Sequence, residues 1–253
     1  MNLMHDIWLL FRRGFIQSLR TPVWLVIGLA TPLLYLGLFT PLLNNLPGGL
    51  GIPGVSAINI FLPGVLALLA FGAGTGQGFG TIFELQEGYI ERLRVTPVSR
   101  FALLVGPILT NIVWLFIFAS VMVFAASFFG FDVNFGGLLI AFVLMSLLLA
   151  VFAAVSVSIA LATRKIESLA AAVNGINLPI MLLSGVLLPL ALAPEWMRVI
   201  AHANPMYYVV EASRLLAAGD IMNNTVGLAF LVMVPLTTLV VWWSTGIFRK
   251  AVS

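Results

Sequence analysis

Few side chains in this 253-residue sequence could carry out acid–base, metal or phosphate chemistry. The two histidines, His5 and His202, lie far apart in the sequence, and no H-E-x-x-H motif includes either of them. The only lysines, Lys165 and Lys250, stand outside any G-x-x-x-x-G-K-[ST] phosphate-binding motif. Cysteine is absent, which excludes disulfides and thiol chemistry. The sequence therefore predicts a protein that is not an enzyme and has no metal site or cofactor of its own.

The elements that surround these few polar groups are long apolar segments. Hydrophobic residues make up 61% of the chain and charged residues 8%, whereas about a quarter of a soluble domain is charged. Apolar segments of roughly 17–25 residues cross a bilayer as helices, because the backbone must satisfy its own hydrogen bonds in lipid. We expect an all-α polytopic membrane protein, with residues 1–253 forming one domain and six transmembrane helices. The expected spans are Val23–Leu43, Ala57–Phe83, Phe101–Phe129, Gly136–Thr163, Ala170–Leu192 and Val226–Phe248.

The distribution of basic residues predicts the orientation of these spans. If the N-terminus is cytoplasmic, ten of the twelve arginines and lysines face the cytoplasm, and only Arg198 and Arg214 lie outside. Such an excess is the positive-inside signature of membrane proteins. The net positive charge of the chain therefore reflects membrane topology rather than nucleic-acid binding. We predict that both termini are cytoplasmic.

Residues 5–20, ahead of the first span, favour an amphipathic helix lying on the membrane surface. At helical spacing, Trp8, Phe11 and Phe15 share an apolar face, which is typical of an interfacial helix. Arg12 and Arg13 add positive charge in the middle of this segment. The alternative is an ordinary basic segment that only sets topology.

A second amphipathic segment is predicted between the second and third spans. Residues 84–100 contain six of the 21 charges, and Pro97 ends any helix there. A short helix over residues 84–96 that protrudes into the cytoplasm would offer a contact surface to a partner, and the alternative is a solvated loop with salt bridges. The candidate contact residues are Glu84, Leu85, Glu87, Tyr89, Glu91, Arg92, Leu93 and Arg94.

The remaining motifs concern packing and the outer surface. The second span contains two ridges of glycines at i, i+4 spacing, one with Gly72, Gly76 and Gly80 and the other with Gly74 and Gly78. Such ridges allow close helix packing, and the alternative is a bendable segment beside a transport path. Residues 194–216 are too charged to span and predict two short outer helices, with a possible i, i+3 pair of charges in the second.

The run Glu91-Arg92-Leu93-Arg94-Val95-Thr96-Pro97-Val98-Ser99-Arg100 closely resembles the signature of ABC type-2 transporter permeases. The outer segment is similar to the same family in Ser184-Gly185, Pro189, Pro194, Trp196, Asn204-Pro205, Tyr208 and Arg214. The resemblance covers nearly the whole chain.

The resemblance implies a mechanism and partners. Two permease subunits, forming a homodimer, would pair with two separate ATPase subunits that bind ATP and Mg²⁺. Residues 84–96 would be the coupling helix that sits on the ATPase, and residues 5–20 would be the connecting helix beside it. Residues 194–216 would form re-entrant helices that cap the path. The location would be the bacterial inner membrane.

The cargo is the least determined part of this prediction. The uniformly apolar spans favour efflux of a drug or another lipophilic or amphipathic compound, and export of a lipid-linked polysaccharide or oligosaccharide is the alternative. An ion-coupled secondary transporter is a more distant alternative, because no span has an ionisable residue near its middle. A scaffold protein that transports nothing is a third class of function. Candidate path-lining residues on the second and fifth spans are Phe71, Phe79, Asn174, Asn177 and Met181.

Overall fold

The computed structural model describes residues 3–44, 57–89, 99–186, 190 and 193–252. Over these ranges the secondary structure consists of nine helices without strands, which confirms the all-α prediction for this part of the chain. The helices are α1 (Leu3–Arg20), α2 (Pro22–Asn44), α3 (Ala57–Gln86), α5 (Arg100–Ser127), α6 (Phe135–Thr163), α7 (Ile166–Leu182), α8 (Glu195–Ala201), α9 (Pro205–Ala217) and α10 (Asn224–Val252).

Five of these helices, α2, α3, α5, α6 and α10, are long and apolar enough to cross a membrane. The predicted span Ala170–Leu192 is wrong in its bounds, because α7 begins at Ile166 and ends at Leu182. The helix stops there because Ser184 N–H bonds back to the Met181 carbonyl and Gly185 adopts a positive φ of 72°. With 17 residues, α7 is about 26 Å long, slightly less than a bilayer core. The count of six spans stays a prediction.

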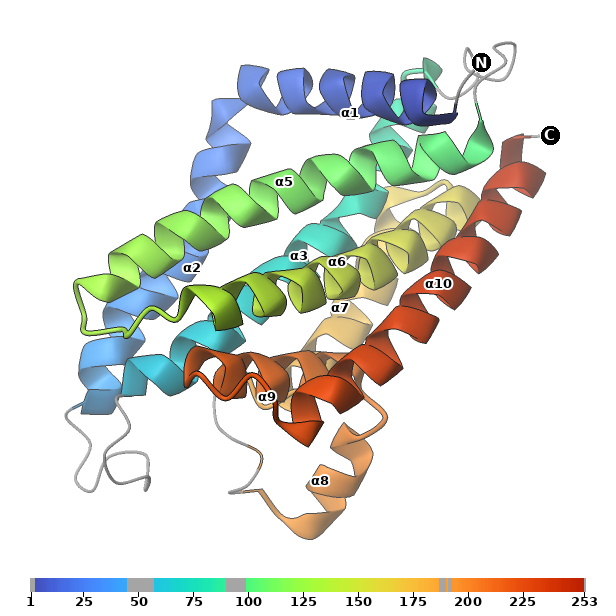
Figure 1. Cartoon of the computed structure of the whole chain (residues 1–253). Helices are drawn as coiled ribbons and strands as arrows, with labels where there is room; N and C mark the ends of the chain where they lie inside the picture. The colour runs from blue at the N-terminus through green and yellow to red at the C-terminus, as the bar shows by residue number, and fades with distance from the viewer. Residues whose placement is uncertain (1–2, 45–56, 90–98, 187–189, 191–192, 253) are drawn as a thin grey trace.

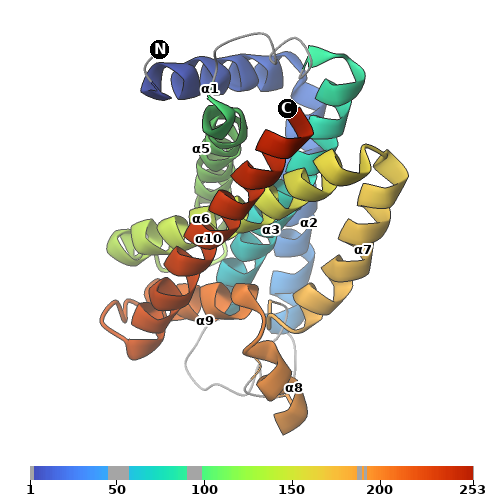
Figure 2. The ribbon, with the colours of Figure 1, turned by 90° about the vertical axis from the view of Figure 1, so that its right-hand side faces the viewer.

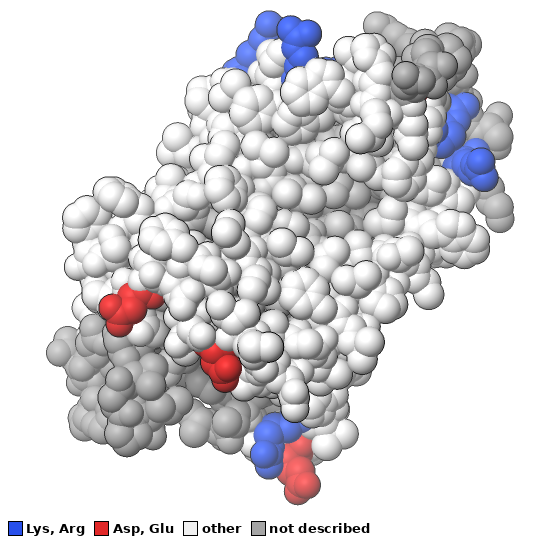
Figure 3. Space-filling view, in the orientation of Figure 1, with Lys and Arg blue, Asp and Glu red and all other residues white. Residues whose placement is uncertain are grey.

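The helices are arranged between two ends of an elongated bundle. In Figures 1 and 2, α1 lies across one end, and the last turn of α3 and the C-terminal part of α10 reach the same end. At the opposite end, α9 lies across the bundle and α8 projects from it. We call these the α1 end and the α9 end. Figure 3 shows charged side chains near the two ends of one face, with an uncharged surface between them.

The α3–α6 pair forms the centre of the bundle. One of the two glycine ridges of α3 faces α6: a Cβ atom at Gly74 would lie 2.7 Å from the Leu149 carbonyl oxygen. At the same ridge, the Ser156 hydroxyl donates to the Thr75 carbonyl at 2.6 Å and accepts from Gly78 N–H at 3.1 Å. Close backbone approach and interhelical hydrogen bonds are how helices associate where lipid is as apolar as protein.

The other glycine ridge of α3 packs against none of the described residues. A Cβ atom at Gly72, Gly76 or Gly80 would have no neighbour within 4 Å in that part of the chain. Each of the two predicted alternatives therefore applies to one ridge. Gly74 and Gly78 allow close packing against α6, while the ridge of Gly72, Gly76 and Gly80 borders open space.

This difference predicts opposite effects for one substitution. Gly78→Ala is expected to destabilise the protein by about 1–3 kcal/mol, because the added methyl group would lie 2.6 Å from the Ser156 carbonyl oxygen. Gly76→Ala, in the same helix, is expected to be neutral or slightly stabilising, since alanine is the better helix former. Thermal unfolding of the two variants in detergent measures the difference. Equal melting temperatures would contradict this packing.

Candidate functional site

At the α1 end, an aromatic ladder holds α1 against α5. The ring centroids of Trp8 and Phe11 are 5.4 Å apart, and those of Phe11 and Phe15 are 5.9 Å apart. Phe15 in turn stacks on Trp114 of α5 at 5.3 Å. The residues predicted to share an apolar face do so, but Trp8 remains 58% exposed, so protein covers only part of that face. The predicted helix is confirmed, and its location on the membrane surface stays a prediction.

Arg13 connects α1 to the end of α3. Its Nη1 atom lies 3.0 Å from Glu84 Oε1, and its Cζ atom lies 3.4 Å from the centroid of the Tyr89 ring. Burial raises the pKa of the Tyr89 hydroxyl, and the positive charge of Arg13 opposes that shift. Arg12, by contrast, is exposed. One guanidinium therefore makes both an ion pair and a cation–π contact with the chain at this point.

Asp6 connects α1 to the start of α5. Its side chain is only 4% exposed, and Oδ2 accepts a hydrogen bond from Ser99 N–H at 3.3 Å. Nothing in the local sequence indicates that Asp6 would be buried. Together, Asp6 and Arg13 bind α1 to the residues that directly precede and follow residues 90–98. We call Asp6, Arg13, Glu84, Tyr89 and Ser99 the α1 clamp.

The predicted coupling helix needs one correction. α3 continues through Gln86 and the chain turns at Glu87 and Gly88, where φ is 69°, so Glu84 and Leu85 belong to α3 and not to a helix that begins at residue 84. Leu85 packs on the main core, and Glu87 is exposed. The other four candidate contact residues, Glu91, Arg92, Leu93 and Arg94, lie outside the described residues.

A charge swap tests the ion pair of the α1 clamp. Arg13→Glu is expected to lower the free energy of unfolding by about 1 kcal/mol, because it places two carboxylates together and removes the contact with Tyr89. The effect is modest since both partners keep partial contact with water. The double variant Arg13→Glu with Glu84→Arg is expected to recover part of the loss. A double variant less stable than either single variant would show that the charges do not interact.

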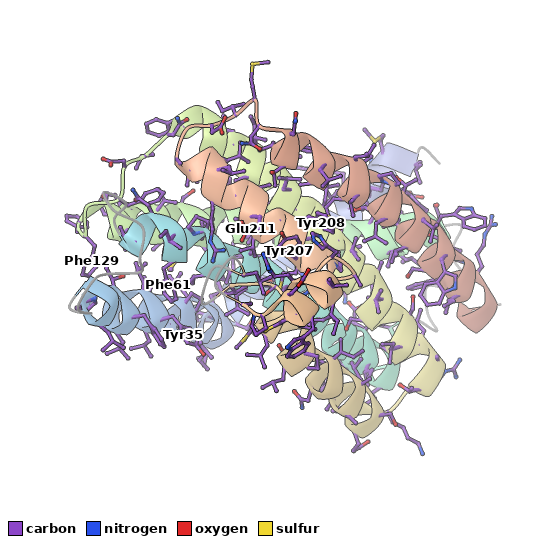
Figure 4. The ribbon with its side chains drawn as sticks, turned by 90° about the horizontal axis from the view of Figure 1, so that it is seen from below. Tyr35, Phe61, Phe129, Tyr207, Tyr208 and Glu211 are labelled. Atoms are coloured by element: carbon purple, nitrogen blue, oxygen red, sulfur yellow. The ribbon has the colours of Figure 1, made fainter. Side chains whose placement is uncertain are left out.

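At the α9 end, a largely buried arginine joins three segments. Arg214 of α9 pairs with Glu211 at 2.8 Å, which confirms the predicted i, i+3 pair. Its Nε–H also donates to the Ile60 carbonyl of α3 at 3.0 Å, and Nη2 donates to the Gly185 carbonyl just after α7. Burial lowers the pKa of the Arg214 guanidinium, and Glu211 opposes this shift. Figure 4 shows Glu211 beside Tyr207 and Tyr208 at this end.

Asn204 makes a second connection at the α9 end. Its side-chain oxygen caps α9 by accepting from Met206 N–H at 3.0 Å, and its amide nitrogen donates to the Ile180 carbonyl of α7 at 2.8 Å. The two short helices predicted within residues 194–216 are confirmed as α8 and α9, while their location outside the membrane and their re-entrance into the bilayer stay predictions. Of the other residues in the outer motif, Trp196 is exposed and Pro189 lies outside the described residues.

A cavity of about 590 Å³ opens beside the free glycine ridge of α3. Its walls come mainly from α2, α3 and α5, with Ser18 of α1 and Asn177 of α7 at its edges. Of the five candidate path-lining residues, Phe71 and Asn177 border this cavity. Phe79 packs instead against a small cluster around Ile82, and Asn174 is exposed. Met181 is half-buried elsewhere on α7. We call this cavity the groove.

A second cavity, of about 260 Å³, lies at the α1 end. Its walls include the charged side chains of Arg13, Glu84 and Glu87. The two cavities share the wall residues Ser18, Gln77, Gly80 and Asn111. In none of the described ranges do three or more metal-ligating side chains come together. The two cavities therefore offer space and hydrogen-bonding groups.

Comparison with known proteins agrees with this arrangement. The family model described as ABC-2 type transporter matches residues 5–217. The ycf38 transport permease of Cyanophora paradoxa is 30% identical over 215 residues, which cover 84% of this chain and 74% of that protein. The ycf38 transport permeases of Porphyra purpurea and Pyropia yezoensis are 27% and 30% identical, each over 88% of this chain and 78% of their own length.

Proposed function

Because the chain belongs to the ABC-2 type transporter family and is a multi-pass transport permease, we propose that it is the membrane subunit of an ATP-driven exporter. Its cargo is a lipophilic or amphipathic compound, taken from the cytoplasm or the inner leaflet. ATP and Mg²⁺ bind to a separate ATPase subunit, since this sequence contains no phosphate-binding loop. Two copies of the chain pair in the complex, in a bacterial inner membrane.

The observation that carries the proposal is the α1 clamp. It binds α1 to both sides of residues 90–98, which contain most of the motif shared with the family. A force applied to residues 90–98 reaches α3 through Glu84 and Tyr89, and it reaches α5 through Ser99. Both helices border the groove. Coupling between distant sites needs such rigid, contiguous elements.

Reconstitution tests the exporter mode. The tagged chain is purified from its source cells together with any co-purifying ATPase, and each preparation is placed in proteoliposomes. The complex is expected to hydrolyse ATP faster when the lipophilic dye Nile red is added, whereas the chain alone hydrolyses none. Uphill movement of cargo by the chain alone, driven by a proton or sodium gradient, would replace the proposal with a secondary transporter.

Cysteine labelling of the chain, purified after the reaction, tests the proposed orientation, and the absence of native cysteines removes background labelling of the chain itself. Met222→Cys, at a side chain 97% exposed near the α9 end, is expected to react with a membrane-impermeant maleimide added to intact cells. Arg249→Cys, at the α1 end, is expected to react only after the cells are opened. This pattern follows from the positive-inside rule. The reverse pattern would place the α1 end outside.

A further inference from the structure

Two amide side chains lie where the groove meets the charged cavity of the α1 end. Gln77 of α3 and Asn111 of α5 border both cavities, and Asn111 Nδ2 donates a hydrogen bond to Gln77 Oε1. Ser18 and Gly80 complete the shared wall. The amide pair thus separates a space with charged walls from a space without them.

The wall of the groove has no charged side chain among the residues described there. Its polar groups away from the amide pair are the hydroxyls of Thr31 and Tyr35, the amide of Asn177 and the indole N–H of Trp114. An ionised group in such a place would lack a counter-charge, and burying an unpaired charge costs several kcal/mol. An uncharged hydroxyl, by contrast, can accept a hydrogen bond from one side-chain amide and donate one to the other. The groove therefore selects against charge.

The shape of the groove suits a long apolar body. Gly72 and Gly76 leave the α3 backbone uncovered along one wall, and no side chain of the described residues would lie within 4 Å of a Cβ atom at either position. Phe118 of α5 lies along another wall. The opposite side of α3 is held by Gly74 against α6, so this wall is rigid. A volume of about 590 Å³ falls within the range of sites for drug-sized molecules.

We propose that the groove binds one uncharged amphiphile, whose polar end replaces the hydrogen bond between Gln77 and Asn111 and whose apolar body lies along Gly72 and Gly76. This inference rests on the proposed export function and narrows its cargo to neutral compounds with a hydrogen-bonding end. The exchange leaves neither amide without a partner, because a hydroxyl at the polar end accepts from Asn111 Nδ2 and donates to Gln77 Oε1.

Photo-crosslinking in lipid nanodiscs tests this site without any ATPase. The probes are a diazirine-tagged dioctanoylglycerol, which is neutral, and the matching dioctanoyl phosphatidic acid, which has the same chains and a negative charge. The neutral probe is expected to label peptides of α3 and α5 and to be displaced by unlabelled dioctanoylglycerol. The anionic probe is expected to label them about tenfold less. Equal labelling by both probes would overturn the proposal.

A matched pair of glycine variants locates the site. Gly76→Leu fills the groove and is expected to reduce labelling by the neutral probe about tenfold. Gly246→Leu makes the same change at another open helical glycine, on α10 and outside the groove, and is expected to leave labelling unchanged. Equal labelling of the two variants, with unchanged melting temperatures, would show that the probe binds elsewhere. If crosslinking fails, the groove does not bind the neutral probe, and ATP-driven export is still decided by the reconstitution assay. If reconstitution shows no ATP-driven export, the crosslinking result still decides whether the groove binds the probe.

Discussion

Arg214→Met is expected to lower the free energy of unfolding by about 3 kcal/mol, which corresponds to a fall of about 6–12 °C in the melting temperature. The guanidinium contacts Glu211, the Ile60 carbonyl and the Gly185 carbonyl, and methionine replaces none of these hydrogen bonds. The value lies at the lower end for a broken buried ion pair, because Glu211 keeps part of its hydration. Thermal unfolding of the purified protein in detergent provides the measurement.

Two further variants make this prediction specific. Arg198→Met is the same substitution on α8 at an exposed position, and it is expected to change stability by less than about 0.5 kcal/mol. Arg214→Lys keeps the charge but not the guanidinium geometry, and its melting temperature is expected to remain well below that of the unmodified protein. A melting temperature for Arg214→Met that matches that of Arg198→Met would contradict the role assigned to Arg214 in joining α3, α7 and α9.

Two substitutions in the family motif, each of which changes the local charge, are expected to abolish coupling to the ATPase while the protein stays in the membrane. Glu91→Arg and Leu93→Asp change two residues that we expect at the ATPase contact from the resemblance to the family, Glu91 through its charge and Leu93 through its apolar side chain. We expect each variant to reach the membrane in normal amount and to lose co-purification of the ATPase. ATP-dependent transport should fall to the background of the chain alone. Both measurements use the reconstituted complex.

Glu195→Arg provides the matched control for these variants. It reverses the charge of an exposed glutamate on α8, at the opposite end of the bundle, and is expected to leave co-purification and transport unchanged. If Glu91→Arg and Leu93→Asp also transport normally, residues 84–96 are not the coupling element. If only Glu195→Arg loses transport, the ATPase contacts the α9 end of the bundle and not the α1 end.

Several features could be predicted from local sequence. Long apolar segments predicted the helices that cross the bundle, because backbone groups in lipid must pair within their own helix. The i, i+3 spacing of Glu211 and Arg214 predicted their ion pair, since these positions are neighbours on any helix. The amphipathic pattern of residues 5–20 predicted α1 for the same reason. The family motif lies in contiguous residues and needed no fold to be recognised.

Other features depended on tertiary structure. Gly74 and Gly76 belong to equally regular ridges, yet only Gly74 packs against α6. Periodicity could not distinguish them, because in a membrane both the packed face and the lipid-facing face of a helix are apolar. The contacts of Asp6 with Ser99 and of Gln77 with Asn111 join residues 93 and 34 positions apart, so no local pattern contains them. The sequence by itself determined which segments are helices, and only their packing decided which faces meet and where the groove lies.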